Sequence, residues 1–371
     1  MSGLLLVIVV GARFLVPLLT FRFPLPAILA ALVIDAADQT VIDAILDRPF
    51  DAYQTYDKAL DIHYLALAYL STMRNWRNDL AFRVVRVLFL YRLVGVFLFE
   101  WTDSRWLLLV FPNTFEYAFI AYELVGTRWD PERLGRRAII GSVAAIWIVV
   151  KLPQEWWIHI AQRDVTDTLA DHPWTWSLLV AAVAAPILAV VAFRRRIPEP
   201  DHRLTFDVDR RQPPPGSQLP LEDGFFSAVL VEKIMLLTLI VQIFAFVLPD
   251  VEATDVGLVG GTVTLIVFNA AITQIVRSRR GRGWSSVAVE FGIVLAVNVG
   301  LVVLDAAIGD ERVGDLPAGS TLFFVVLVSV FIALFDRYRL RRRAMLRRAA
   351  RWRAMIESRR SRTSQVDGSR R

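Results

Sequence analysis

The sequence contains no cysteine. Disulfide bonds, thiolate ligands for metals and cysteine nucleophiles are therefore excluded for this chain. The absence does not indicate a compartment, because a chain without cysteine is compatible with oxidising and with reducing surroundings.

Several short enzyme motifs are missing as well. The chain has no Walker phosphate-binding loop, no Rossmann glycine fingerprint, no His-Glu-x-x-His motif and no nucleophile elbow. ATP hydrolysis by this chain alone, nicotinamide chemistry and zincin-type hydrolysis are therefore disfavoured. No repeat period marks a solenoid, and no internal symmetry marks an inverted repeat.

Lysine is rare, and arginine carries nearly all of the positive charge. The formal net charge is +6, and the lysines are Lys58, Lys151 and Lys233. The excess of positive charge lies in a few loops and in the C-terminal tail, which reflects membrane orientation rather than nucleic-acid binding. We therefore expect no nucleic-acid partner. The preference for arginine, with abundant alanine and valine, favours a bacterial source.

Long apolar runs are abundant. Hydrophobic residues make up 55% of the chain, and the mean hydropathy is +0.47. Several runs reach the ~20 residues that a helix needs to cross a bilayer core, whereas a β-barrel would show short alternating segments. The sequence predicts an all-α, polytopic transmembrane bundle of about ten or eleven spans. Candidate spans lie near residues 3–20, 24–44, 55–75, 81–99, 105–125, 138–158, 174–193, 226–249, 256–277, 286–306 and 317–335.

Loop charges predict the orientation of these spans. The basic loops near residues 194–196 and 277–280 alternate with the acidic loops 250–255 and 305–315. By the positive-inside rule, the basic loops and the C-terminus face the cytoplasm of a cell membrane, as do loops 74–83 and 126–137. Segment 55–75 is too polar for lipid exposure, so we expect a bundle-interior helix or a re-entrant segment. The side of the N-terminus depends on which of these it is.

The domain organisation follows from composition. Residues 1–194 form a charge-rich transmembrane half, 195–224 a proline-rich cytoplasmic linker, 225–336 a four-helix transmembrane half, and 337–371 a basic tail that we expect to be partly disordered. In the tail, Tyr338, Met345 and Trp352 recur every seven residues. This spacing favours an amphipathic helix on anionic inner-leaflet lipids, and the alternative is a stop-transfer charge cluster followed by disorder.

Aspartates gather between residues 35 and 63. A pair at i,i+3 and a pair at i,i+4 each share a helix face, and two such pairs could hold a divalent cation with a phosphate group. Ordinary loop charges, or pairing with arginine, are the alternatives. The candidate metal ligands are Asp35, Asp38, Asp57 and Asp61, with Lys58 beside them.

Further ionisable residues lie inside other apolar segments, where charge is costly and usually functional. Arg86 and Arg92 belong to an arginine ladder with three-residue spacing, which is typical of a voltage sensor, although pairing with carboxylates or binding of an anionic substrate such as phosphate fits better. Glu116 follows Pro112 and Asn113, where we expect a kinked helix with freed backbone carbonyls.

Lys151, Glu155 and His159 follow one another at i,i+4 steps, so one helix face carries a base, an acid and an imidazole. Such a face could transfer protons or bind a charged headgroup, and the alternative is a paired polar helix end.

Two functions are the main candidates at this stage, and a structural partner of another complex is a third possibility. The first is a transporter or channel-like protein with a charged intramembrane pathway in its N-terminal half. The second is a membrane-embedded enzyme that acts on a phosphorylated or lipid-linked substrate through an aspartate-bound divalent cation. We favour transport, because the charges are dispersed over several helices rather than concentrated at one place.

Overall fold

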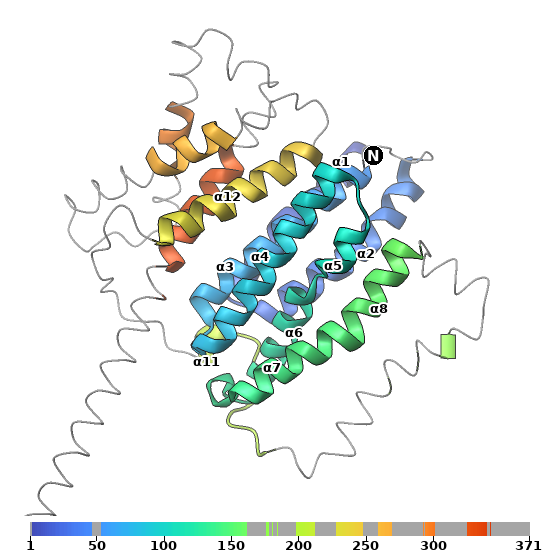
Figure 1. Ribbon diagram of the computed structural model, residues 1–371, viewed down its shortest axis with the longest axis vertical. Coiled ribbons are helices and arrows are strands. Elements are labelled where there is room, and N and C mark those ends of the chain that lie inside the picture. The colour runs from blue at the N-terminus through green and yellow to red at the C-terminus, as the bar shows by residue number, and fades with distance from the viewer. Residues whose placement is uncertain are drawn as a thin grey trace, which may run out of the picture. The chain divides into compact units, whose positions relative to one another are not determined.

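The three-dimensional structure is a computed structural model (Figure 1). It describes residues 2–46, 53–161, 176–177, 180, 184, 198–211, 228–247, 259–268, 292, 294–300, 325–339 and 342. Regular structure in this part of the chain is helical throughout, with no strand, which confirms the all-α class. The predicted span 174–193 lies almost wholly outside the described residues.

Two of the described helices have the length and apolar character to cross a membrane. They cover Arg136–Ile160 and Val229–Phe246, and shorter apolar helices cover Gly11–Phe21, Pro24–Ala36 and Val259–Phe268. This is support by length and composition only. The larger number of spans expected from the sequence stays a prediction.

The chain divides into two compact units. Unit 1 comprises Met1–Phe82 and Asp207–Arg371, and unit 2 comprises Arg83–Phe206. The first boundary falls inside helix α4 (Asp79–Thr102), and the second falls within the proline-rich segment. The boundaries of these two compact units therefore differ from the domain boundaries predicted from composition.

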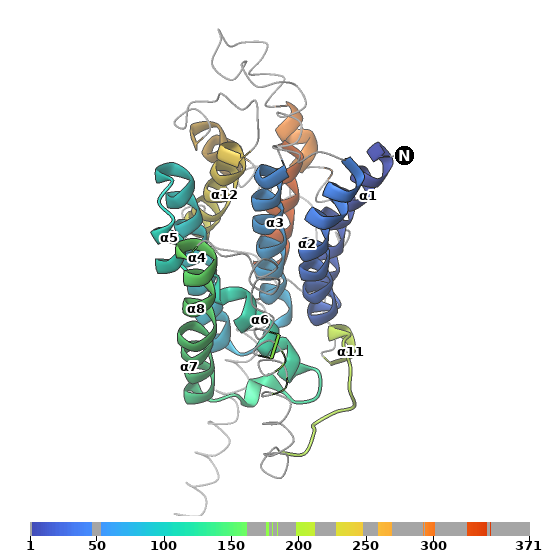
Figure 2. The same ribbon diagram turned by 90° about the vertical axis from the view of Figure 1, so that its right-hand side faces the viewer.

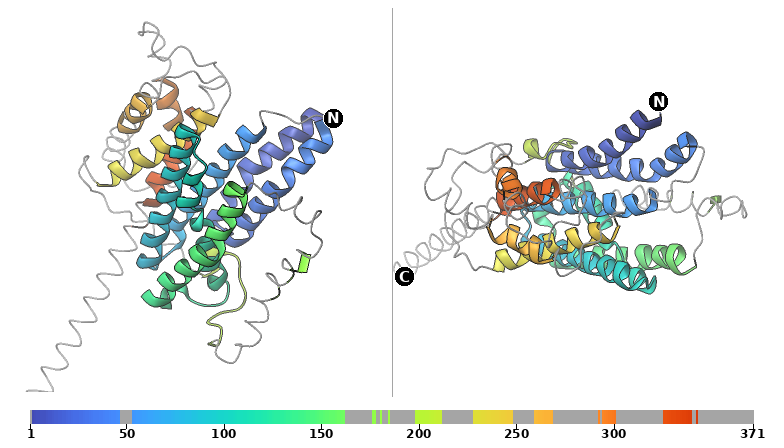
Figure 3. Two further views of the ribbon diagram at one scale, coloured as in Figure 1. Left: turned by 45° about the vertical axis from the view of Figure 1, so that its right-hand side comes forward. Right: turned by 90° about the horizontal axis from the view of Figure 1, so that it is seen from above.

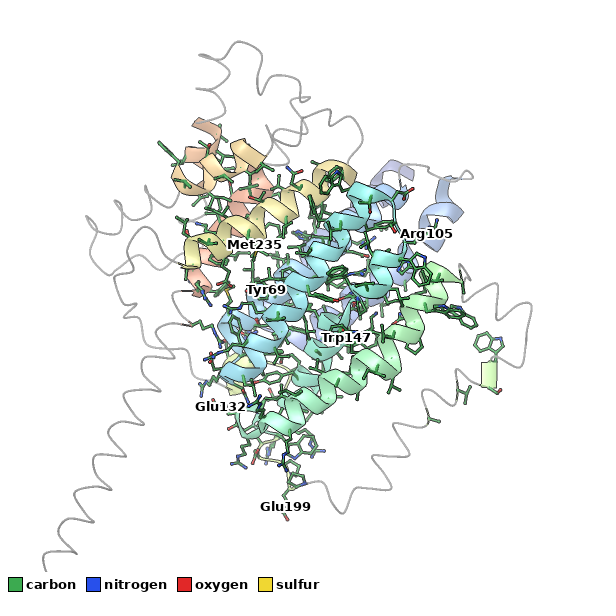
Figure 4. The ribbon with its side chains drawn as sticks, in the orientation of Figure 1. Tyr69, Arg105, Glu132, Trp147, Glu199 and Met235 are labelled. Carbon is green, nitrogen blue, oxygen red and sulfur yellow. The ribbon has the colours of Figure 1, made fainter. Side chains whose placement is uncertain are left out.

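Unit 1 is built around helix α3 (Tyr53–Asn75). It contacts α1 (Ser2–Leu15), the 3-10 helix η1 (Val16–Phe21), α2 (Pro24–Leu46) and α12 (Ala228–Val247). Figure 2 shows α3 between α2 and α12. Leu67, Ala68 and Tyr69 on successive sides of α3 are fully buried, and Tyr69 is labelled in Figure 4. The polar segment 55–75 is thus a continuous helix inside its bundle.

One end of unit 1 holds the start of the C-terminal tail. The helix at residues 325–339 carries Tyr338, whose buried ring stacks on Phe21 at 4.6 Å between centroids. Tyr338 therefore packs inside the protein, whereas the seven-residue pattern predicts that it faces lipid. Met345 and Trp352, which complete that pattern, lie outside the described residues.

Arg342 reaches deepest into this end of unit 1. Its side chain is almost fully buried, and it donates to the Trp76 carbonyl at 2.8 Å and to Asp79 Oδ1 at 2.9 Å. Its guanidinium lies 3.4 Å from the centroid of the Phe82 ring, which adds a cation–π contact. Trp76 closes α3 and Asp79 begins α4, so a tail residue holds the turn between these helices.

Unit 2 contains one long helical rod and a broken helix. The rod runs from Arg136 to Ile160 through α7 (Arg136–Ala145), the π-helical turn η3 (Ile146–Lys151), α8 (Leu152–Glu155) and a second π-helical turn, η4 (Trp156–Ile160) (Figure 3). Trp147 on this rod, labelled in Figure 4, lies 5.5 Å from the ring of Tyr91 on α4. π-Helical turns often mark functional sites.

The segment expected as one kinked helix, 105–125, is instead two helices. Helix α5 (Trp106–Val110) ends, the backbone leaves helical geometry from Phe111 to Asn113, and α6 (Thr114–Gly126) begins anew. The residue before a proline avoids helical geometry, and Phe111 with ψ of 63° obeys that rule before Pro112. Gly95 on α4 faces the break, where a Cβ atom would overlap Phe111 Cβ.

Candidate functional site: a buried polar cluster in unit 2

The aspartate-rich region of unit 1 centres on an arginine that the sequence analysis did not select. Buried Arg13 pairs with Asp35 and with Asp61, the latter at 3.0 Å. Both carboxylates are therefore held by a guanidinium. No group of three or more metal-ligating side chains occurs among the described residues. The side chains of Asp38, Asp57 and Lys58 lie outside them, so a cation bound by all four aspartates stays a prediction.

The arginine ladder, which consists of Arg74, Arg77, Arg83, Arg86 and Arg92, is divided between the two units. Arg74 donates to the Phe21 carbonyl and pairs with Asp209 in unit 1. Arg86 is half-buried on α4, and Arg92, two turns further on, donates to the Phe111 carbonyl at 3.0 Å in unit 2. Arg92 thus contacts the helix break.

Lys151, Glu155 and His159 lie on one face of the rod, as their spacing predicts. Lys151 Nζ is 3.5 Å from Glu155 Oε1, and His159 Nε2 is 3.0 Å from Glu155 Oε2. Lys151 and Glu155 are 4% exposed, whereas the His159 side chain is 26% exposed. The face therefore runs from a partly accessible imidazole to a buried acid–base pair.

The helix break joins this face through Asn113. The Asn113 backbone N–H donates to Glu155 Oε1 at 3.1 Å, and its side-chain amide donates to Glu116 Oε2 at 2.6 Å. Asn113 thus connects two buried carboxylates on different helices. The contact arises because the break frees a backbone N–H that a continuous helix would have used internally.

The remaining neighbours, Tyr117 and Gln154, are half-buried. Lys151 Nζ lies 4.6 Å from the Tyr117 ring centroid and donates to Gln154 Oε1 at 3.0 Å. Three buried polar atoms of the cluster have no hydrogen-bond partner within the described structure: Arg92 Nε, Asn113 Oδ1 and Thr114 Oγ1. Unsatisfied buried polar atoms are costly, and these three belong to the helix break or to Arg92, which bonds to it.

The sequence pointed to most of this cluster but not to all of it. The intramembrane criterion selected Arg92, Glu116, Lys151, Glu155 and His159, which the structure brings together in unit 2. Tyr117 and Gln154 were missed, since an aromatic and an amide carry no charge signal. Arg13 in unit 1 was also missed, although a charge within an apolar run was available as a signal.

Comparison with known proteins found no matching family model, no matching curated protein and no matching solved structure.

Proposed function

We propose that the chain is a multi-pass integral membrane protein that moves a small charged solute through unit 2, along the cluster at the helix break. The observation that carries the proposal is the broken helix itself. Its freed Phe111 carbonyl and Asn113 N–H bond to Arg92 and Glu155. Interrupted helices beside buried charges are how membrane transporters build substrate sites.

Contacts in unit 1 support the orientation. Arg342 of the basic tail donates to the Trp76 carbonyl, so the tail meets the loop 74–83, and loop charge assigns both of these segments to the cytoplasm. Tyr338 of the same tail stacks on Phe21. Helix α3 has 23 residues and extends ~34 Å from this end. The acidic loop before Tyr53 then lies outside the cell, together with the N-terminus.

Contacts in unit 2 agree with this orientation. The Trp129 indole donates to the Pro198 carbonyl, and Arg133 pairs with Asp201. Both partners belong to segments that the charge pattern assigns to the cytoplasm. His159 at the far end of the rod then faces the outside, and Lys151 lies deeper in the membrane.

Flux measurements test the proposal. Purified protein in proteoliposomes is supplied in turn with labelled chloride, phosphate, sodium and rubidium, and with a pH gradient read by an enclosed dye. We expect wild-type vesicles to move at least one of these ions and Glu116→Gln to slow that movement several-fold, because a buried charge on the pathway is lost.

The matched control is Glu132→Gln, the same chemical change at an exposed position of unit 2. Its flux should equal that of the wild type. Vesicles that stay tight to every ion, or equal flux in Glu116→Gln, would overturn the proposed function.

A further inference from the structure

The Glu155 carboxylate interacts with three donor groups. It accepts the Asn113 backbone N–H from the start of α6, and it is paired with Lys151 and His159 on its own rod. Both of its oxygens are engaged. These are the groups with which proteins usually bind free anions: a helix N-terminus, an ammonium and an imidazole.

Two further groups that can donate a hydrogen bond lie at or beside the start of α6. The helix has 13 residues, so its N-terminal amides present a partial positive charge. Thr114, its first residue, is 1% exposed, and its Oγ1 has no hydrogen-bond partner within the described structure. The Nε of Arg92 is likewise unpartnered there, although Arg92 donates through Nη1 to Phe111 beside the same break.

We propose that the cluster is an anion-binding site, that a small inorganic or carboxylate anion is its ligand, and that Glu155 occupies this site with its own side chain in the state described here. The substrate class rests on the proposed function, whereas the binding site itself does not. The guest would take the Asn113 N–H and Lys151 when the Glu155 carboxylate withdraws.

Charge balance favours an exchange rather than a simple addition. Arg92 and Lys151 face Glu155 and Glu116, with His159 at the accessible edge and the neutral Tyr117 beside Lys151. A second anion added to this set would leave uncompensated negative charge in a desolvated place. If Glu155 takes up one proton while one monovalent anion enters, the net charge of the cluster is unchanged.

Removal of the resident carboxylate makes the site testable. In Glu155→Ala the vacated space matches a formate ion, whose carboxylate has the same shape and charge. We expect 100 mM sodium formate to raise the Tm of the detergent-solubilised variant by about 2 °C over sodium gluconate at equal ionic strength. Wild type should show no such difference, because Glu155 fills the site.

Two further variants keep the test decisive. Glu155→Gln fills the site with a neutral group of the same size, so formate should have little effect even if Glu155→Ala folds poorly. In the background of Glu155→Ala, Lys151→Met should abolish the formate effect. Glu132→Ala, an exposed carboxylate deletion in unit 2, is the matched control and should behave as the wild type does.

The outcomes separate this inference from the proposed function. Formate stabilisation confined to Glu155→Ala supports the anion site even if vesicles show no flux. Equal formate effects in Glu155→Ala and Glu132→Ala, or none in either, overturn the anion site, whatever the flux measurements give.

Discussion

At the scale of single residues, buried arginines bind carboxylates at two places in unit 1. Arg342 shows how such a charge is accommodated. Burial lowers its pKa to about 10, and the neighbouring carboxylate of Asp79 offsets part of that effect. Arg342 is therefore still charged at neutral pH. Its hydrogen bonds to Trp76 and Asp79 replace those that the guanidinium would make with water.

Loss of this side chain should destabilise unit 1. We expect Arg342→Gln to lower the free energy of unfolding by about 2 kcal/mol, because two hydrogen bonds and the contact with Phe82 disappear. Arg342→Lys should recover only part of the lost stability, because a single ammonium cannot donate to both acceptors as the guanidinium does. Denaturant titration in detergent measures both variants. Arg105→Gln, at an exposed arginine, should stay near the wild type.

Arg13 permits a second residue-scale prediction. Arg13→Gln leaves Asp35 and Asp61 near one another without their shared partner. We therefore expect the free energy of unfolding to fall by about 3 kcal/mol. Adding Asp35→Asn should restore part of the stability, because like charges no longer face each other. A double-mutant cycle by thermal unfolding measures the coupling. Additive losses would contradict the pairing, and tighter manganese binding by Arg13→Gln would support the predicted cation site.

The sequence predicted the composition of the buried cluster better than its connections. Lys151, Glu155 and His159 align because helical spacing is local. The hydrogen bond from Asn113 to Glu155 depends on a backbone N–H that the break frees. The sequence pattern does not indicate which distant acceptor this N–H will bond.

At the scale of elements, the close approach of α4 to the helix break constrains the cluster. Gly95 leaves room for Phe111, whose carbonyl Arg92 holds. We expect Gly95→Ala to displace Phe111 and to cost about 1–3 kcal/mol, as overpacking does. The substitution raises helix propensity, so a stabilised variant would show that the contact is loose. Gly141→Ala on α7, where a Cβ meets nothing within 4 Å, is the control.

Helix positions were predictable because long apolar runs favour helices. The break in 105–125 was predicted as a kink. Proline alone kinks a helix, but here Phe111 and Asn113 both leave helical geometry, and their main-chain groups bond to Arg92 on α4 and to Glu155 on the rod. Tertiary contacts therefore converted a kink into an interruption.

At the scale of the whole molecule, orientation is open to a direct test, because the chain has no native cysteine. We expect Ala52→Cys and Gly309→Cys to react with a membrane-impermeant maleimide in intact cells. Ser278→Cys should react only after permeabilisation. These results follow if α3 spans with its C-terminal end in the cytoplasm. Protection of Ala52→Cys until permeabilisation would mean that α3 does not span and that the N-terminus is cytoplasmic.

The contact between Arg342 and Trp76 also has a consequence for biosynthesis. The two residues are separated by 266 positions along the chain. At ~5–20 residues per second, the ribosome needs roughly 13–53 s to travel that distance. During this interval the turn after α3 has been synthesised, but Arg342, which bonds to it, has not. The nascent protein therefore stays in a partly assembled state. A premature stop just before codon 342 would make that waiting state permanent.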